Sequence, residues 1–168
     1  MRIRPERPGD EAEIGATTGA AFAGKTYSDQ TEPQMIERLR RAGALTISLV
    51  AEEDGRVVGH VAFSPVTLSG GEAGWYGLGP ISVRPDRQKQ GIGSALIHEG
   101  MERLRALGAQ GCVLVGDPGY YNRFGFAAAD PALKVADVPP EYFLVLPLQG
   151  SVPSGIVAFH PGFYGNAT

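Results

Sequence analysis

The chain has 168 residues, of which 43% are hydrophobic and 20% are charged, and its net charge is −3. This length favours a single domain with a core of its own, and the slight acidity argues against a nucleic-acid binder that relies on a basic surface. The single cysteine, Cys112, excludes an internal disulfide and a thiolate metal cluster, and its apolar neighbours predict a buried position.

The first residues, 1–11, contain no apolar signal core, and no stretch of the sequence reaches the ~18 apolar residues that a membrane span requires. We therefore expect a cytoplasmic protein that has neither a membrane nor a nucleic acid as its partner. The three histidines show no spacing typical of a metal site, so no metal is expected either.

Two helices are predicted in the N-terminal part, after a short strand at 2–4. Asp10 and Thr31 each stand three residues before a Glu or Gln, as in a capping box, and each is followed by apolar residues. The connection between the helices, 23–30, contains glycine and charged residues. Such a loop could line a substrate cleft, but we favour a simple polar connection between two helices.

A β-hairpin follows the helices. Apolar and polar residues alternate over 45–52, which is typical of a strand, and 56–64 returns as its partner. Asp54 and Gly55 between them are typical of a tight hairpin turn. A pair of glycines at 70 and 71 marks a second turn before the next strand.

Residues 76–107 have the pattern of a strand, a basic glycine-containing loop and a long helix. Ile81 and Val83 are β-branched and point to one face of the strand. Gly79 and Pro80 predict a bulge, because proline cannot donate to a sheet ladder and glycine permits a close backbone approach. We expect this strand to splay from one neighbour and to leave backbone groups unpaired.

The loop after this strand has the features of an anion site. Gly91 and Gly93 leave the first backbone N–H groups of the helix uncovered, and such a terminus binds anions, above all phosphate. Arg87 and Lys89 add positive charge at the same end. A solvated basic turn explains the same residues without any ligand. The helix is predicted from apolar residues at 92, 96, 97, 101, 104 and 107, with Gly108 after its end.

Three further strands are predicted after the helix. The short apolar run 112–116 is expected to be buried and parallel to the strand before the helix, so that the divergence of the two strands opens a V-shaped slot. Residues 141–148 alternate as a strand, and 154–159 are expected to form one more at an edge. Residues 161–168 are expected to be a tail.

Two segments fit a pair of family motifs. Residues 88–93, Gln-Lys-Gln-Gly-Ile-Gly, fit Q/R-x-x-G-x-G/A, and residues 121–126, Tyr-Asn-Arg-Phe-Gly-Phe, fit Y-x-x-x-G-F. With both motifs at this spacing, the chain closely resembles the GNAT superfamily of acetyl-CoA-dependent N-acetyltransferases, in particular a subgroup of uncharacterised predicted acetyltransferases. The resemblance covers residues 1–148 as one GNAT-like domain. Residues 149–168 are expected to extend the same domain by an edge strand and a tail.

The resemblance implies a mixed α/β fold of α+β character. Its central sheet is mixed and mostly antiparallel, splays into a V between two parallel strands, and is flanked by helices. The resemblance also implies a reaction in which an acetyl group moves from acetyl-CoA, the co-substrate, to a primary amine by direct attack in a ternary complex, without a metal. The acceptor would be a small-molecule or peptide amine, and a homodimer is left open.

Site residues follow from the resemblance as well. Tyr121 would donate a proton to the departing thiolate, and a backbone N–H near Ile81 would face the thioester carbonyl. A phenol with a pKa near ~10 is protonated at neutral pH and can donate in this way; a core tyrosine bonded to the backbone is the alternative. The predicted cofactor-binding residues are Ile81, Ser82, Val83, Gln88, Lys89, Gln90, Gly91, Ile92, Gly93 and Ser94.

No general base stands out in the sequence. His60, Asp117 and Glu141 qualify by chemistry alone, but a histidine in an apolar strand is more often a core residue. His98 is expected on the solvated face of the long helix. A water relay, or an amine that arrives neutral, would need no base. Two other functions therefore stay open: a coenzyme-A-binding sensor or subunit without transferase activity, and a binder of a phosphate ligand unrelated to coenzyme A.

Overall fold

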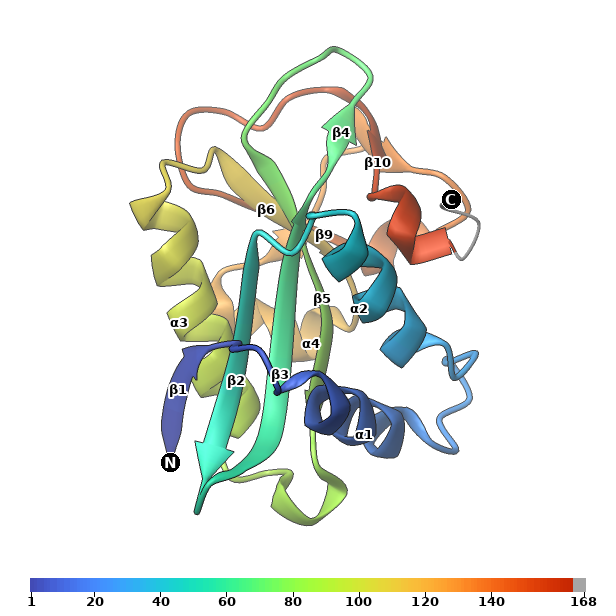
Figure 1. Cartoon of the computed structure of the whole chain (residues 1–168). Coiled ribbons are helices and arrows are strands. Elements are labelled where there is room, and N and C mark those ends of the chain that lie inside the picture. The colour runs from blue at the N-terminus through green and yellow to red at the C-terminus, as the bar shows by residue number, and fades with distance from the viewer. Residues whose placement is uncertain (165–168) are drawn as a thin grey trace.

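The computed structural model describes residues 1–164 and is shown in Figure 1. Residues 165–168, part of the expected tail, lie outside the described residues. The strands are β1 (Arg2–Pro5), β2 (Ile47–Glu53), β3 (Arg56–Pro65), β4 (Thr67–Leu68), β5 (Trp75–Val83), β6 (Gly111–Val115), β7 (Ala127–Ala128), β8 (Leu133–Val135), β9 (Phe143–Pro147) and β10 (Gly155–Ala158). The helices are α1 (Glu11–Phe22), α2 (Glu32–Arg41), α3 (Ile92–Ala106) and α4 (Pro118–Tyr121), with 3-10 turns η1 (Pro85–Arg87), η2 (Asn122–Phe124), η3 (Pro140–Tyr142) and η4 (Pro161–Tyr164).

A seven-stranded sheet in the order β1-β2-β3-β5-β6-β9-β7 forms the centre of the fold. Its strands are antiparallel neighbours except β5 and β6, which run parallel and are connected through α3. A small sheet, β4-β10-β8, lies beside it. The predicted mixed, mostly antiparallel fold with two parallel strands is therefore confirmed.

The helices cover both faces of the large sheet. α3 packs on one face, where its apolar side chains join Leu49 and Phe63 in the main core, and α1 and α2 pack on the other through Ile14 and Ile36 (Figure 1). Burial of each such side chain stabilises the fold by about 1.5–3 kcal/mol. In the described part of the chain, no helix is long and apolar enough to cross a membrane.

The parallel strands β5 and β6 diverge as predicted. They pair only from Trp75 to Gly77 on β5, and beyond this point β6 pairs with β9 alone. On the other side of β5, the pairing with β3 moves from Phe63–Leu78 to Val61–Ile81. Two residues of β5, Gly79 and Pro80, therefore stand opposite the single residue Ala62 and form a bulge. The bulge bends β5 away, which leaves its last residues without a neighbour on the β6 side.

The predicted capping boxes are not formed. The Asp10 carboxylate accepts hydrogen bonds from the Arg4 guanidinium at 2.7 and 3.1 Å and from the backbone N–H of Arg7, while α1 has no side-chain cap. The carboxylate of Glu13 accepts the backbone N–H of Val57 instead. Thr31 leaves α2 uncapped as well. An ionic and a long-range partner thus take the side chains of Asp10 and Glu13, and the hydroxyl of Thr31 donates to the carboxylate of Asp29 at 2.6 Å.

Two expectations for the C-terminal part are wrong. β10 is not at an edge but lies between β4 and β8. The segment 161–164 is not tail-like, because it forms η4 and packs on α2, where Arg38 donates to the carbonyl of Gly162 at 2.8 Å. The expected place of Leu107 on the apolar face of the long helix is also wrong, because Leu107 is the C-cap residue of α3 and is 57% exposed.

Candidate functional site

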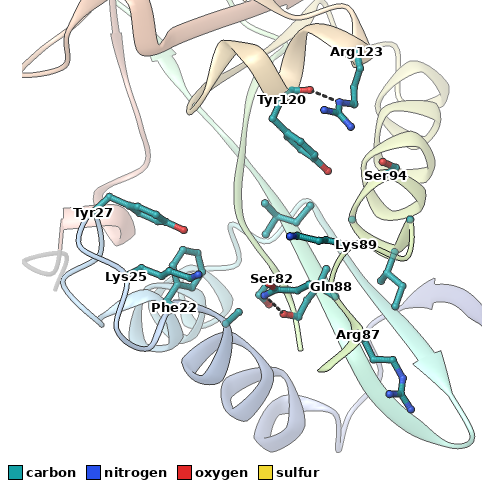
Figure 2. A pocket seen from close by; sticks show the side chains of 16 residues that line it. Phe22, Lys25, Tyr27, Ser82, Arg87, Gln88, Lys89, Ser94, Tyr120 and Arg123 are labelled. Atoms are coloured by element: carbon teal, nitrogen blue, oxygen red, sulfur yellow. Dashed lines mark hydrogen bonds between the residues drawn. The ribbon is translucent and has the colours of Figure 1, made fainter. Parts of the chain in front are cut away.

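A cavity of about 640 Å³ lies where β5 and β6 have separated. Its walls come from the end of α1, the loop 23–30, the end of β5, the N-terminal end of α3, and the segment from α4 to η2 (Figure 2). All of the predicted cofactor-binding residues line this cavity except Gln90. The structure therefore brings the strand and the glycine-containing loop together around one space.

The N-terminal end of α3 supplies free hydrogen-bond donors to this cavity. Gly91 precedes the helix in the left-handed conformation, with a φ of 84°, which glycine adopts without strain. The first intrahelical bond runs from the N–H of Ala95 to the carbonyl of Gly91. The N–H groups of residues 92–94 precede it, and no side chain caps them. A 15-residue helix with uncapped donors attracts anions.

The charged side chains that line the cavity are all cationic. Lys25 from the loop after α1, Arg87 and Lys89 from the loop before α3, and Arg123 from η2 line it, whereas no lining residue carries a carboxylate. Arg87 also reaches Glu53 at 2.8 Å, and this ion pair raises the pKa of its guanidinium. Figure 2 shows Lys25 on one side of the cavity and Arg123 on the other. Such a lining favours a polyanionic ligand.

The end of β5 offers backbone groups to the same cavity. The N–H of Arg84 donates to the carbonyl of Val58 on β3 at 2.8 Å, and in an antiparallel pair alternate residues point their backbone groups the same way. The backbone groups of Ile81 and Val83 therefore point away from β3, toward the space that β6 has left. The side chain of Gln88 donates to the carbonyl of Val83 at 3.0 Å.

Two neighbouring tyrosines lie at this end of the molecule in different surroundings. Tyr120 lines the cavity, and its hydroxyl is 3.2 Å from the position that a Cβ on Gly93 would take. Tyr121 does not line it; its ring lies against Gly116, which follows β6, and edge-on to Phe126 at 6.2 Å between centroids. The pKa of Tyr121 is raised to about 12, mainly by burial and to a lesser extent by Tyr120, Tyr27 and Asp117. Its hydroxyl makes no hydrogen bond within residues 1–164.

The three candidate bases lie outside the cavity lining. His60 is fully buried beside Ser48, so the interpretation as a core histidine is confirmed. Asp117 accepts the N–H of Gly119 at the start of α4, and Glu141 is exposed in η3. No group of three or more His, Cys, Asp or Glu side chains in the described part of the chain could hold a metal ion.

Seven lining residues lie outside the predicted cofactor-binding set: Ala21, Phe22, Lys25, Tyr27, Arg87, Tyr120 and Arg123. Of these, only Arg87 was named from the sequence, as a positive charge at this end of the helix. The expectation of a simple polar connection at 23–30 is wrong, because Lys25 and Tyr27 from this loop line the cavity. Tyr120 immediately precedes the second motif segment, and Arg123 lies within it. Arg123 lies over the Tyr120 ring, 4.6 Å from its centroid, and donates to the Tyr120 carbonyl at 2.8 Å. Arg123 stands at a position of the Y-x-x-x-G-F motif where any residue is allowed. A cation at such a position was the signal in the sequence that could have identified it.

Comparisons with known proteins agree on one family. The family model described as the acetyltransferase (GNAT) family matches residues 16–126. The chain is 38% identical over 130 residues to the uncharacterised N-acetyltransferase YhbS of Escherichia coli K12, which covers 77% of this chain and 75% of YhbS. The crystal structure of Escherichia coli YhbS in complex with CoA has a TM-score of 0.89 at 34% identity, covering 99% of this chain and 93% of that chain.

A second solved structure is similar at higher sequence identity. It is a GNAT family acetyltransferase from Brucella melitensis in complex with acetyl-CoA. It is 54% identical to this chain with a TM-score of 0.87, and the match covers 96% of this chain and 97% of the other. The resemblance inferred from the two motifs is confirmed by these matches, which extend well beyond the motifs themselves.

Proposed function

Because this chain belongs to the acetyltransferase (GNAT) family, we propose that the cavity between β5 and α3 binds acetyl-CoA and that the protein transfers its acetyl group to a primary amine. The observation that carries this proposal is the uncapped N-terminal end of α3, which faces backbone groups of β5 that pair with no neighbouring strand, in a cavity whose lining, within residues 1–164, has no carboxylate. Two similar proteins have been crystallised with acetyl-CoA or CoA. The lining fits a ligand that has phosphates at one end and amides along its length.

Different residues of this chain would bind different parts of acetyl-CoA. The N–H groups of residues 92–94 and the ammonium of Lys89 would hold the pyrophosphate, since a helix terminus and a nearby cation reinforce each other. The outward backbone groups of Ile81 and Val83 would pair with the amides of the pantetheine arm. The Gln88 amide, which occupies the Val83 carbonyl, would move aside when that carbonyl accepts from the ligand.

At the reacting end, two donors would act on the thioester that the coenzyme supplies. The N–H of Ile81 would stabilise negative charge on the thioester oxygen, as a fixed backbone donor does in an oxyanion hole. By the family motif, the Tyr121 phenol would donate a hydrogen bond to the departing sulfur. Tyr121 does not itself line the cavity but lies next to it, with its ring 4.9 Å between centroids from that of Tyr120, which does. Because its pKa of about 12 lies well above the ~8.5 of a cysteine thiol, full transfer of the phenol proton to the thiolate is uphill. Tyr121 would therefore stabilise the thiolate while the net proton comes from the amine.

The acceptor would attack the thioester directly in a ternary complex. In the part of the chain that the structure describes, the cofactor cavity contains no carboxylate to serve as base, so the amine would lose its proton to water. The nature of the acceptor, a homodimer and a cytoplasmic location stay predictions from the sequence.

Thermal melting in the presence of acetyl-CoA, free CoA, NAD and ATP tests the proposal. A ligand at ~100 times its dissociation constant stabilises the native state by ~2.7 kcal/mol, which raises the melting temperature by several degrees at this size. We expect a shift with acetyl-CoA and CoA that is reduced in Lys89→Glu. Lys134→Glu is the matched control, because Lys134 is exposed on β8 away from the cavity. The absence of a shift with saturating acetyl-CoA and CoA contradicts the proposal.

A sensor without transferase activity would give the same melting shift, so turnover must be measured separately. With a panel of primary amines, a transferase releases the thiol of CoA in proportion to the amide formed. A binding module shows the shift and no amine-dependent release.

A further inference from the structure

A second cavity, of about 300 Å³, lies on the other side of the β5 bulge. Leu78, Gly79 and Pro80 line it, and the next three residues of β5 line the cofactor cavity. Val115, the last residue of β6, lines it as well, at the point where β6 has left β5. Phe22 at the end of α1 lines both cavities. The two cavities therefore approach each other at the splay, where the thioester end of a cofactor in the first cavity would lie.

The lining of the second cavity is apolar except for Glu32 and the phenol of Tyr164. The aromatic rings of Phe22, Phe159 and Phe163 contribute to it, and the last two lie 5.3 Å apart between centroids. Among the described residues that line it, Glu32 is the single charged side chain. Glu32 is half-buried at the start of α2, where the hydroxyl of Ser28 donates to both of its carboxylate oxygens, at 2.8 and 2.7 Å. This carboxylate is thus held in place rather than free in solvent.

The two cavities have opposite electrostatic character. The first is lined by four cationic side chains and repels an ammonium group, whereas the second is neutral except for the Glu32 carboxylate and attracts one. A single fixed carboxylate matches one cation. A polyamine would leave further ammonium groups among apolar side chains, and the carboxylate of an amino acid would face both Glu32 and an apolar wall; burying such unpaired charges is unfavourable.

We propose that the second cavity binds the acetyl acceptor, and that this acceptor is a small primary amine with an aliphatic or aromatic body and one positive charge, bound through Glu32. This inference rests on the function proposed above. The apolar body occupies the cavity, whose volume of about 300 Å³ suits a small molecule. The ammonium pairs with Glu32 on entry.

The reaction balances without a further reactant. The ammonium releases one proton to solvent, and the neutral nitrogen forms a bond to the acetyl carbon while the carbon–sulfur bond breaks. The sulfur leaves with the bonding electron pair and takes up the second proton that the nitrogen loses. The products are an N-alkyl acetamide, the CoA thiol and one proton.

Acetyl transfer with purified full-length protein, followed by CoA thiol release, tests the inference with phenethylamine, spermidine and L-lysine as acceptors. We expect kcat/KM for phenethylamine to exceed that for each of the other two by about tenfold or more. Glu32→Gln should lower kcat/KM for phenethylamine by about tenfold or more, mainly through KM, because a hydrogen bond to a charged group is lost. Glu37→Gln, at an exposed position of the same helix outside the cavity, is the matched control and should leave it unchanged.

The failure of this inference and of the proposed function can be told apart by the melting shift with acetyl-CoA. If the shift is present but spermidine or L-lysine is the better acceptor, or phenethylamine is not acetylated, the assignment of the acceptor is overturned while cofactor binding stands. The same holds if Glu32→Gln behaves like Glu37→Gln. If acetyl-CoA gives no shift, the proposed function fails and the acceptor assignment fails with it.

Discussion

His60 makes the stability of the fold depend on pH in a window that can be worked out from the structure. The ring is fully buried in β3, and its Nε2 lies 2.8 Å from the hydroxyl of Ser48, which donates to Glu6 at 2.6 Å. Nε2 therefore carries the proton of the neutral ring and donates to Ser48. Nδ1 is buried without a partner among the described residues, so a second proton there would have no acceptor.

Burial is the main reason that the pKa of His60 falls from 6.5 to about 4. The charges of Glu6 and Asp10 raise it and that of Arg40 lowers it. The unfolded chain takes up a proton on His60 below pH 6.5, and the folded chain does so only near pH 4, so the free energy of unfolding falls as the pH drops through this window. At about 1.4 kcal/mol for each pH unit, the loss amounts to about 2 kcal/mol between pH 7 and pH 5.

Urea unfolding of wild type and His60→Phe at pH 7 and pH 5 measures the contribution of His60 to this loss of stability. The variant starts from a lower stability because Ser48 loses a partner, but its loss between the two pH values should be smaller than that of the wild type by about 2 kcal/mol. His98→Gln, at an exposed histidine of α3, is the matched control and should keep the wild-type loss. An equal loss in wild type and His60→Phe would refute the reasoning.

Three further predictions concern the proposed donor Tyr121, the core and the proposed anion site. Tyr121→Phe removes the proposed hydrogen bond to the departing sulfur and should lower kcat by about a hundredfold with the acetyl-CoA melting shift retained, whereas Tyr120→Phe should keep kcat; equal effects on kcat would contradict the assignment. Gly100→Ala should lower the free energy of unfolding by about 1–3 kcal/mol in urea, because its Cβ would overlap the Phe63 ring. Gly91→Ala should lower the free energy of unfolding by about 1–2 kcal/mol, because the φ of Gly91 is 84°. It should also weaken the acetyl-CoA melting shift, and an unchanged shift would contradict the role of Gly91 in the anion site.

The parts of the fold that depend on neighbours in sequence could be predicted from the sequence. Gly91 and Gly108 both have positive φ and mark the two ends of α3, and the apolar spacing between them selects one buried face. The turn at Asp54 and Gly55 likewise has positive φ at both residues, as a tight hairpin requires. Each of these features is decided by backbone sterics within a few residues, which is information that the sequence contains locally.

The parts that depend on distant partners could not be predicted. Glu13 fits a capping box with Asp10, but its carboxylate accepts the backbone N–H of Val57, which is 44 residues away. Whether β10 lies at an edge or between two strands depends on which segments it meets, and its neighbours β4 and β8 are far away in sequence. Lys25 is an ordinary loop residue until the fold sets it opposite α3. Pairing across long sequence separations is absent from a local pattern.

Within residues 1–164, no carboxylate that could serve as a general base lines the cofactor cavity, and the electrostatics around the separated ends of β5 and β6 explain why. A carboxylate beside the N-terminal end of α3 would repel the phosphates that this end is arranged to attract, so the cofactor cavity is a poor place for one. The carboxylate of Glu32 lies instead beyond the β5 bulge, in the neighbouring cavity. The bulge at Gly79 and Pro80 therefore separates two electrostatic environments along one strand, one suited to an anionic coenzyme and the other to a cationic amine. The opposite charges of the two ligands can then be accommodated a few residues apart along β5.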